Sequence, residues 1–410
     1  MAGTGARRST AQLERAERRR AVRHHAMAVA ASAVVVVSTV TGVLSAAAGG
    51  GERDTAGPAP TSSPVLAPLP GVPSRVAAAP SVSSPPPSST PLSAPSPSRT
   101  AAARTPSAAA PEGGRRSPER AGPVDAALYR HPASQVLDWV AAHRDDPRRP
   151  LIESRIADRP AAVWFAAYNP GAVTGEVRAV TAGAAAAGRV PVLVPYAIPD
   201  RDCGGASQGG APDLAAYDGW IAEFAAGLGA GPSIVVLEPD SVALSDCLDA
   251  AARADRYASL ARAARTIHAA APKARVYFDA GHSGWHPAER QASLLRAAGA
   301  ASSGDGIFTN VSNFHRTADE AAYARQVLAA LGGPARLGAV IDTSRNGNGA
   351  PAAGQWCDPA GRALGRAPTT DTGEARIDAY LWVKLPGESD GCKGAAGSFT
   401  PDYAYELATG

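Results

Sequence analysis

Short apolar runs alternate with longer stretches of helical period between residues 134 and 383 of this 410-residue chain. Apolar runs bounded by Gly, Pro or charged residues are typical of buried strands, whereas segments with apolar positions every three or four residues are typical of helices. The pattern predicts strands at residues 163–167, 190–196, 233–237, 275–279, 306–310, 337–341 and 379–383. It predicts helices at residues 134–142, 175–187, 214–226, 248–271, 287–300 and 317–331.

This alternation of strand and helix predicts a parallel sheet with right-handed crossover connections. Most of the predicted strands are followed by polar residues, so candidate functional side chains are spread over many strand ends. An open sheet would concentrate its site at one switch point, whereas a barrel assembles its site from many loops at the carboxyl ends of the strands. We therefore expect an α/β fold whose sheet forms a distorted parallel β/α barrel.

The most informative strand end is Glu238-Pro239-Asp240, which follows the apolar run 234–237. Pro239 has no N–H and cannot continue a sheet ladder, so the strand is expected to stop there and present both acids at the end of the sheet. Two carboxylic acids that flank a scissile bond are the minimum machinery of glycoside hydrolysis. Further acids follow the other predicted strands: Asp200, Asp202, Asp279, Asp342, Glu388 and Asp390.

Composition divides the chain into two parts. The first 128 residues contain no Trp, Tyr, Phe or Cys, and all six Trp, ten Tyr, six Phe and four Cys come after them. Because a core needs large apolar side chains, we assign residues 123–410 to one catalytic domain, of a size that suits a single α/β fold. The net charge of +3 comes largely from an Arg-rich N-terminus, and no basic stripe with interleaved aromatics follows it, which gives no support to nucleic-acid binding.

Residues 1–48 are typical of an export signal. A cluster of arginines precedes the apolar stretch 27–44, and three alanines after it fit a cleavage site. We expect cleavage and a secreted protein; the alternative is an uncleaved membrane anchor at residues 27–48, which is just long enough to span a bilayer. Residues 49–122 are rich in Pro, Ser, Ala and Thr, and we expect them to form a disordered, extended linker.

Four cysteines in an exported chain favour disulfides over a metal site. No Cys-x-x-Cys spacing is present, and the histidines near residue 282 have no cysteine neighbours in the sequence, so we expect neither a metal nor another cofactor. Three pairings are open to four cysteines. Because consecutive cysteines lie in neighbouring strand-end loops, we expect the disulfides Cys203–Cys247 and Cys357–Cys392.

Seven further segments occur in order along the folded part, namely VPYAIPDRDCG at 194–204, VLEPD at 236–240, YFDAGHS at 277–283, NVSN at 310–313, IDTSRNG at 341–347, WCDP at 356–359 and WVKLPGE at 382–388. Together they resemble glycoside hydrolase family 6, which holds bacterial and fungal endoglucanases and cellobiohydrolases. The resemblance covers essentially the whole folded part and is highly specific. It implies a distorted barrel of β/α units and hydrolysis of β-1,4-glucan with inversion at the anomeric carbon.

The matching motifs also imply roles for individual residues. Asp240 would be the general acid, and Asp279 would help to keep it protonated and oriented, because a nearby like charge raises a carboxyl pKa. Asp202 would support proton movement, and Asp390 would be the candidate base, acting on water directly or through a water chain. Tyr196 would crowd the reacting sugar and favour its distorted ring. The sugar subsites would be lined by Trp164, Trp285, Trp356, Ser312, Asn313, Lys384 and Glu388.

Loop length predicts the mode of attack. In the family, long loops around the two cysteine pairs roof the cleft into a tunnel and make the enzyme exo-acting, but here only 43 residues lie within the first pair and 34 within the second. We therefore expect an endo-acting, monomeric glucanase with an open cleft. The alternatives are an exo-acting cellobiohydrolase, a non-catalytic glucan-binding cell-wall protein, and a barrel hydrolase of another polymer such as xylan or chitin.

Overall fold

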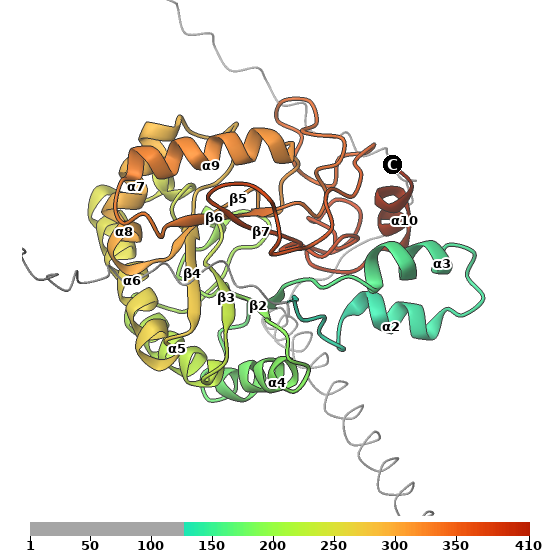
Figure 1. Ribbon diagram of the computed structural model, residues 1–410, viewed down its shortest axis with the longest axis horizontal. Coiled ribbons are helices and arrows are strands. Elements are labelled where there is room, and N and C mark those ends of the chain that lie inside the picture. The colour runs from blue at the N-terminus through green and yellow to red at the C-terminus, as the bar shows by residue number, and fades with distance from the viewer. Residues whose placement is uncertain (1–126) are drawn as a thin grey trace, which may run out of the picture. The chain divides into compact units, whose positions relative to one another are not determined.

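The computed structural model describes residues 127–410, so the predictions for residues 1–48 and 49–122 lie outside the described residues. The described part is built on one seven-stranded parallel sheet, ordered β1-β2-β3-β4-β5-β6-β7 (Figure 1). All seven predicted strands are present. They are β1 (Val163–Phe165), β2 (Val192–Pro195), β3 (Ser233–Leu237), β4 (Ala274–Asp279), β5 (Gly306–Thr309), β6 (Gly338–Asp342) and β7 (Ile377–Leu381).

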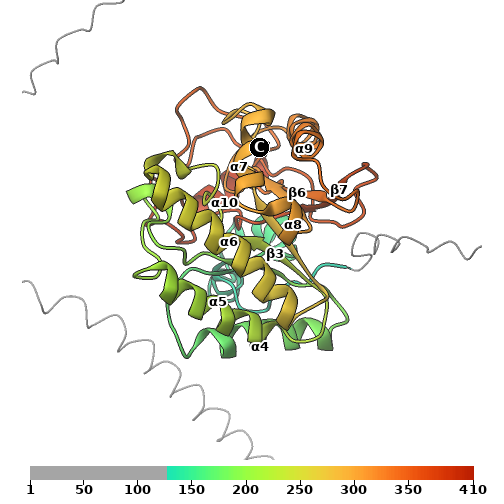
Figure 2. The ribbon, with the colours of Figure 1, turned by 90° about the vertical axis from the view of Figure 1, so that its left-hand side faces the viewer.

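Helices that connect the strands cover the outside of the sheet (Figure 1). They are α4 (Val173–Ala186), α5 (Leu214–Leu228), α6 (Ala250–Ala270), α7 (Ala288–Ala297), α8 (Ala300–Ser303) and α9 (Thr317–Leu331). Within this series α4 packs against α5, α5 against α6, and α7 against α9; α4, α5 and α6 lie side by side in Figure 2. The helix predicted at 287–300 is present as α7 but ends earlier, at Ala297, because Gly299 adopts a left-handed φ of 75° that separates α7 from α8.

The sheet curls until its two edge strands meet. The N–H of Ala162, just before β1, donates to the carbonyl of Trp382, just after β7, at 2.9 Å. The indole N–H of Trp164 donates to the carbonyl of Val383 at 2.7 Å. Among the described strands the ladder runs from β1 to β7 without a β1–β7 pairing, so these two bonds form the seam of the barrel. The predicted distorted β/α barrel is confirmed.

The alternation of side chains along each strand divides the core into two. In β3, Ile234 and Val236 belong to a cluster inside the barrel, whereas Val235 and Leu237 belong to the larger cluster between sheet and helices. Strands buried on both faces are expected to be continuously apolar. This explains why the strands were visible in the sequence as uninterrupted apolar runs.

A third layer lies beside β7. It consists of α2 (Gln135–Ala142), α3 (Arg149–Ile152), a π-helical turn at Glu153–Ala157, and α10 (Pro401–Thr409). Their buried side chains pack around Trp382 and Leu385, which follow β7. Only α2 among these elements was predicted from the sequence. The layer brings the start of α2 beside the long loop that follows β7, where Gln135 donates to the carbonyl of Gly397 at 2.7 Å.

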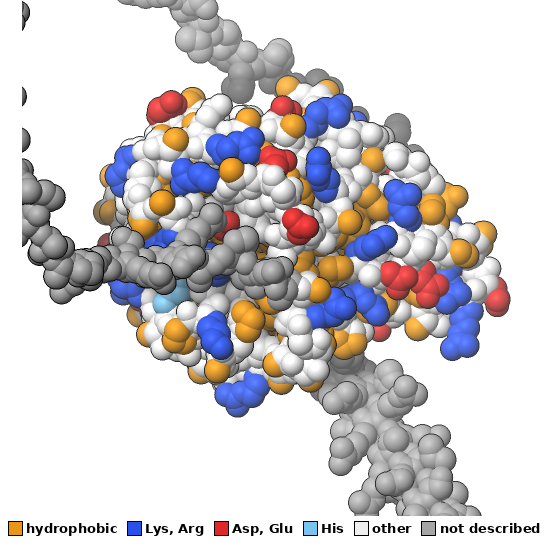
Figure 3. Space-filling view, viewed as in Figure 1, with side chains coloured by type: hydrophobic (Ala, Val, Ile, Leu, Met, Phe, Trp, Pro, Cys, Tyr) orange, Lys and Arg blue, Asp and Glu red, His pale blue; other side chains and the backbone are white. Residues whose placement is uncertain are grey.

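The surface in Figure 3 carries Lys and Arg side chains interspersed with acidic and apolar ones, so this face has no field of a single sign. Within residues 127–410, no helix combines the length and the apolar character that crossing a bilayer requires.

Candidate active site

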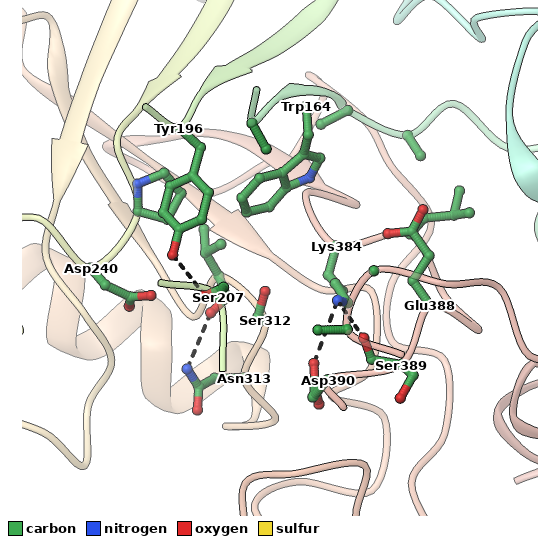
Figure 4. A pocket seen from close by; sticks show the side chains of 18 of the residues that line it. Trp164, Tyr196, Ser207, Asp240, Ser312, Asn313, Lys384, Glu388, Ser389 and Asp390 are labelled. Atoms are coloured by element: carbon green, nitrogen blue, oxygen red, sulfur yellow. Dashed lines mark hydrogen bonds and ion pairs between the residues drawn. The ribbon is translucent and has the colours of Figure 1, made fainter. Parts of the chain in front are cut away.

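A cleft of about 1020 Å³ opens over the carboxyl ends of the strands. Figure 4 shows its labelled side chains pointing into one space, with Asp240 and Tyr196 on one side and Lys384, Glu388 and Asp390 on the other. Asp279 is buried next to this cleft and does not line it. The other predicted site residues all line it: Trp164, Tyr196, Asp202, Asp240, Trp285, Ser312, Asn313, Trp356, Lys384, Glu388 and Asp390.

Backbone strain gathers in the loops around this cleft. Within residues 127–410, nine residues other than Gly have a positive φ, and eight of them lie in loops after β2, β3, β5 and β6. Such conformations are held only where the surroundings determine them, and they cluster at functional sites. The eight are Asp200, Asp202, Cys203, Glu238, Asp240, Asn310, Ser312 and Asp358.

Asp240 follows β3 with a left-handed φ of 67°. Burial, followed by the charges of Asp279 and Asp202, raises the pKa of the Asp240 carboxyl to about 8. The carboxyl is therefore protonated at neutral pH and faces the cleft. A protonated acid in this place can donate a proton to the leaving oxygen of a bound substrate.

Asp279, at the end of β4, is held from three directions. Its carboxylate accepts hydrogen bonds from the backbone N–H groups of Val242 (3.1 Å), Ala243 (2.7 Å) and Gly281 (2.9 Å). Burial raises the pKa of Asp279 above its ordinary value as well, and these three donors offset part of that rise because they stabilise the ionised form. Among the described residues Asp240 has no such donors, so in the Asp240–Asp279 pair the surroundings favour the proton on Asp240.

Tyr196 and Asp202 are joined by Ser207, which the sequence analysis did not single out. The Ser207 backbone N–H and hydroxyl donate to one oxygen of Asp202 at 2.7 and 2.9 Å. The hydroxyls of Ser207 and Tyr196 are 3.0 Å apart. The loop that carries Asp202 and Ser207 is tied to the loop after β3 by the predicted disulfide Cys203–Cys247, which is present.

Asp390 lies across the cleft from Asp240 (Figure 4). The guanidinium of Arg345, which is wholly buried, donates to it at 2.8 Å, and the ammonium of Lys384 lies 3.6 Å away. The backbone N–H of Asp358 donates to the same carboxylate at 3.2 Å. The second predicted disulfide, Cys357–Cys392, is also present and joins the loops that carry Asp358 and Asp390.

Two of the strand-end acids fasten loops. Glu238 is fully buried and accepts hydrogen bonds from the backbone N–H groups of Ala197 and Ile198 at 3.0 Å. The strand ends before Pro239 as expected, but the Glu238 side chain turns into the protein, and of the two acids only Asp240 lines the cleft. Asp342 accepts from the N–H groups of Ser312 at 3.1 Å and Lys384 at 3.0 Å, and so joins two loops that line the cleft.

Aromatic side chains line the cleft at several points. The ring of Trp164 meets that of Tyr196 edge-on, with centroids 5.3 Å apart. Trp285 packs beside His282, and Trp356 is 57% exposed. Flat apolar rings with accessible faces suit contact with the apolar faces of sugar rings.

Glu388 lies at the border between the cleft and α2. Burial raises the pKa of the Glu388 carboxyl to about 7, although the charges of Lys384 and Arg345 lower it. The side-chain amide of Gln135 donates to this carboxyl at 3.4 Å.

Within residues 127–410, no group of three or more His, Cys, Asp or Glu side chains is arranged to hold a metal ion.

Several side chains around these acids escaped the sequence analysis as functional candidates. Arg345 stands inside the segment IDTSRNG, which the resemblance had singled out, so its motif was the available signal. Asp358 likewise stands inside WCDP. Ser207 and Gln135 lie in segments with no such signal, and only the folded loops bring them to the acids.

Comparison with known proteins decides the family. Residues 125–409 match the family model described as glycosyl hydrolases family 6. The chain belongs to this family. The resemblance drawn from the motifs is thereby confirmed, and this family 6 chain is a glycoside hydrolase whose Asp240 and Asp390 face the same cleft.

Individual relatives agree with this assignment. The family 6 chain is 56% identical to endoglucanase 1 of Streptomyces sp. (strain KSM-9) over 69% of its length and 78% of the relative's. It is 51% identical to endoglucanase A of Thermobispora bispora over 70% of its length, but spans only 64% of that protein. The solved structure of the endoglucanase Cel6 from Mycobacterium tuberculosis, in complex with a thio-linked cellobioside, is similar with a TM-score of 0.65 and 40% identity, covering 70% of this chain and 98% of that one.

Proposed function

We propose that this chain is an exported endo-β-1,4-glucanase that cleaves internal bonds of cellulose with inversion at the anomeric carbon. The observation that carries the proposal is the placement of two carboxyls, those of Asp240 and Asp390, on opposite sides of one cleft. One carboxyl able to give a proton and a second one across the cleft are the pair that glycoside hydrolysis requires.

In the proposed reaction, Asp240 donates its proton to the glycosidic oxygen as the bond to the anomeric carbon breaks. The ionised Asp279 keeps that proton on Asp240 before the substrate arrives. Ser207 links Tyr196 to Asp202 by hydrogen bonds and so holds both side chains in place. In the proposed reaction, Tyr196 presses on the reacting sugar, and Asp202 supports proton movement around Asp240. General acid catalysis of this kind contributes on the order of 10²–10⁴ in rate.

Asp390 would accept the proton of the attacking water, directly or through a second water. Its contacts with Arg345 and Lys384 fix the direction of its carboxylate. Attack by water from the face opposite the leaving group inverts the anomeric carbon, and inverting enzymes hold their two carboxyls roughly 6.5–9.5 Å apart to admit that water.

Attack in mid-chain is supported by the short loops around both disulfides and by the two bacterial relatives described above, both of which are named endoglucanases. Export is supported by those two disulfides, which persist in oxidising compartments. The subsite residues proposed for the glucan are Trp164, Trp285, Trp356, Ser312, Asn313, Lys384 and Glu388.

The proposal is tested by release of reducing sugar from carboxymethylcellulose and by proton NMR of the first product anomer. We expect activity on this β-1,4-glucan, far less on xylan or chitin, and the α-anomer as the first product. A β-anomer appearing first would overturn inversion, and glucan binding without any release of sugar would favour the non-catalytic alternative.

A further inference from the structure

The loop that carries Asp390 is wrapped around one buried carboxylate, that of Asp358. This side chain is only 4% exposed, and one of its oxygens accepts the backbone N–H of Asp390 at 2.7 Å. Its other oxygen accepts the Ser389 hydroxyl at 2.5 Å and the backbone N–H groups of Cys392 and Lys393 at 3.0 and 2.8 Å. One carboxylate therefore fixes residues on both sides of Asp390.

The two acids also hold each other. The backbone N–H of Asp390 donates to the side chain of Asp358, while the backbone N–H of Asp358 donates to the side chain of Asp390 at 3.2 Å. Such a reciprocal exchange fixes the direction of the Asp390 carboxylate as well as the place of its backbone. Arg345 lies 2.8 Å from Asp390 and 3.9 Å from Asp358, so its charge offsets the repulsion between the two carboxylates.

Asp358 is ionised at neutral pH. Burial raises the pKa of its carboxyl, but the hydrogen bonds from Ser389 and from the backbone of Asp390, Lys393 and Cys392 together lower it to about 2. Ser389 extends the arrangement, because its oxygen accepts the backbone N–H groups of Gly391 at 2.9 Å and Gly394 at 3.0 Å.

We propose that Asp358 is a positioning residue, which acts on the reaction through Asp390 without touching the glucan. Its carboxylate would keep the loop 389–394 folded so that the carboxylate of Asp390 stays aimed into the cleft. This inference rests on the proposed function, in which Asp390 activates the attacking water. A displacement of about 1 Å in a reacting group can cost about 100-fold in rate, so a residue of this kind has a measurable kinetic effect.

The first test is Asp358→Asn in the full chain. An amide has one accepting oxygen, so in either orientation its NH₂ group faces a backbone N–H that has lost its acceptor. We expect kcat on carboxymethylcellulose to fall about 10- to 100-fold with KM changed less than about threefold, because only the water-activating group moves. Unchanged kcat in a folded Asp358→Asn variant would overturn the inference.

The matched control is Asp305→Asn. Asp305 accepts the backbone N–H of Val276 and the ring N–H of His268, both at 2.9 Å, at the opposite end of the sheet from the cleft. Loss of a loop-fastening carboxylate there should lower the midpoint of thermal unfolding and leave kcat unchanged. If both variants lost kcat in proportion to lost stability, Asp358 would be a structural residue only and the inference would fail.

A double variant, Asp358→Asn with Asp390→Asn, further separates a positioning role of Asp358 from a purely structural one. If Asp358 acts through Asp390, the double variant is no slower than Asp390→Asn alone; multiplied losses would overturn the inference. Wild-type kcat in Asp390→Asn would overturn it as well, since Asp358 would then have no base to position, while the glucanase activity itself would stand.

Ser389→Ala tests the same claim should Asp358→Asn not fold. It removes one donor to Asp358 and the acceptor for Gly391 and Gly394. We expect kcat to fall about 3- to 10-fold, less than for Asp358→Asn because Asp358 keeps its three backbone donors, and to fall no further on the Asp390→Asn background. Full wild-type kcat in Ser389→Ala, or a further fall on that background, would count against the positioning role.

Discussion

Asp240 and Asp279 stand at the ends of neighbouring strands and have opposite surroundings. Asp279 receives three backbone N–H groups, and no hydrogen bond to the Asp240 carboxyl is found within the described residues. Donors that point at a carboxylate stabilise its charge, and burial without donors stabilises the acid form. In the proposed mechanism these surroundings give two chemically identical side chains different tasks, one as the proton donor and the other as the charge beside it.

We predict that Asp240→Asn lowers kcat on cellulose by about 10²–10⁴, because an amide cannot donate the proton that the leaving oxygen needs. A substrate with a good leaving group, such as a dinitrophenyl cellobioside, needs less protonation and should lose much less. Initial rates on both substrates check this, with the unfolding midpoint as a control for folding. Equal losses on the two substrates would contradict the acid role.

The pH dependence follows from the same residue. The raised pKa of Asp240, about 8, means that the acid form persists at neutral pH and is lost as the pH rises through that value, so kcat/KM should fall on the alkaline side. In Asp279→Asn one of the charges that raise this pKa is gone, and the alkaline limb should move to lower pH. The shift is partial because burial, the larger cause, remains. Asp371→Asn, at an exposed position, should leave the profile where it is.

At the scale of elements, strand-end carboxylates set the positions of the cleft loops. Glu238 fastens the loop after β2, and Asp342 joins the loops after β5 and β7. Each of these carboxylates accepts hydrogen bonds from backbone N–H groups that would otherwise be buried without a partner. The rigid sheet therefore extends its order into loops that have no regular structure of their own.

The strands were predictable because burial on both faces leaves continuous apolar runs. The task of each strand-end acid was harder to predict. Glu238 and Asp240 are two residues apart, yet the left-handed backbone at both positions directs one side chain into the protein and the other into the cleft. The contacts of Ser207 and Asp358 lie in loops whose sequences have no regular apolar pattern. Such a sequence does not predict which loops contact each other.

We predict that replacing both Cys357 and Cys392 with Ser lowers the free energy of unfolding by about 2–4 kcal/mol. The disulfide closes a long loop, so its loss raises the conformational entropy of the unfolded chain. Urea unfolding with and without reductant measures the effect. The pair Cys203 and Cys247 closes a loop of comparable length, 44 against 35 residues of separation, and should give a loss of similar size. An unchanged midpoint would show that the cross-link is redundant.

For the whole molecule, loop length decides where along a polymer it can act. A cleft without a long roof admits a glucan away from its ends, so the viscosity of carboxymethylcellulose should fall early, before much reducing sugar appears. A roofed tunnel would require a free chain end and release mainly cellobiose. Viscometry together with a reducing-end assay checks this. Cellobiose as the main product at nearly constant viscosity would contradict endo action and leave the role of Asp240 intact.

The seam between β1 and β7 is the boundary with the fewest hydrogen bonds among the described strands of the barrel. Six of its strand boundaries are ladders, while the seventh is held by the amide of Ala162 and the indole of Trp164. Local opening begins where the fewest hydrogen bonds hold the structure together, so thermal fluctuations should open the barrel at this seam first. In hydrogen-exchange mass spectrometry, peptides containing Ala162 should take up deuterium faster than those spanning β3 and β4. Trp164 lines the cleft, and its indole N–H also holds the seam closed. A bound glucan that stacks on its ring should therefore slow that exchange.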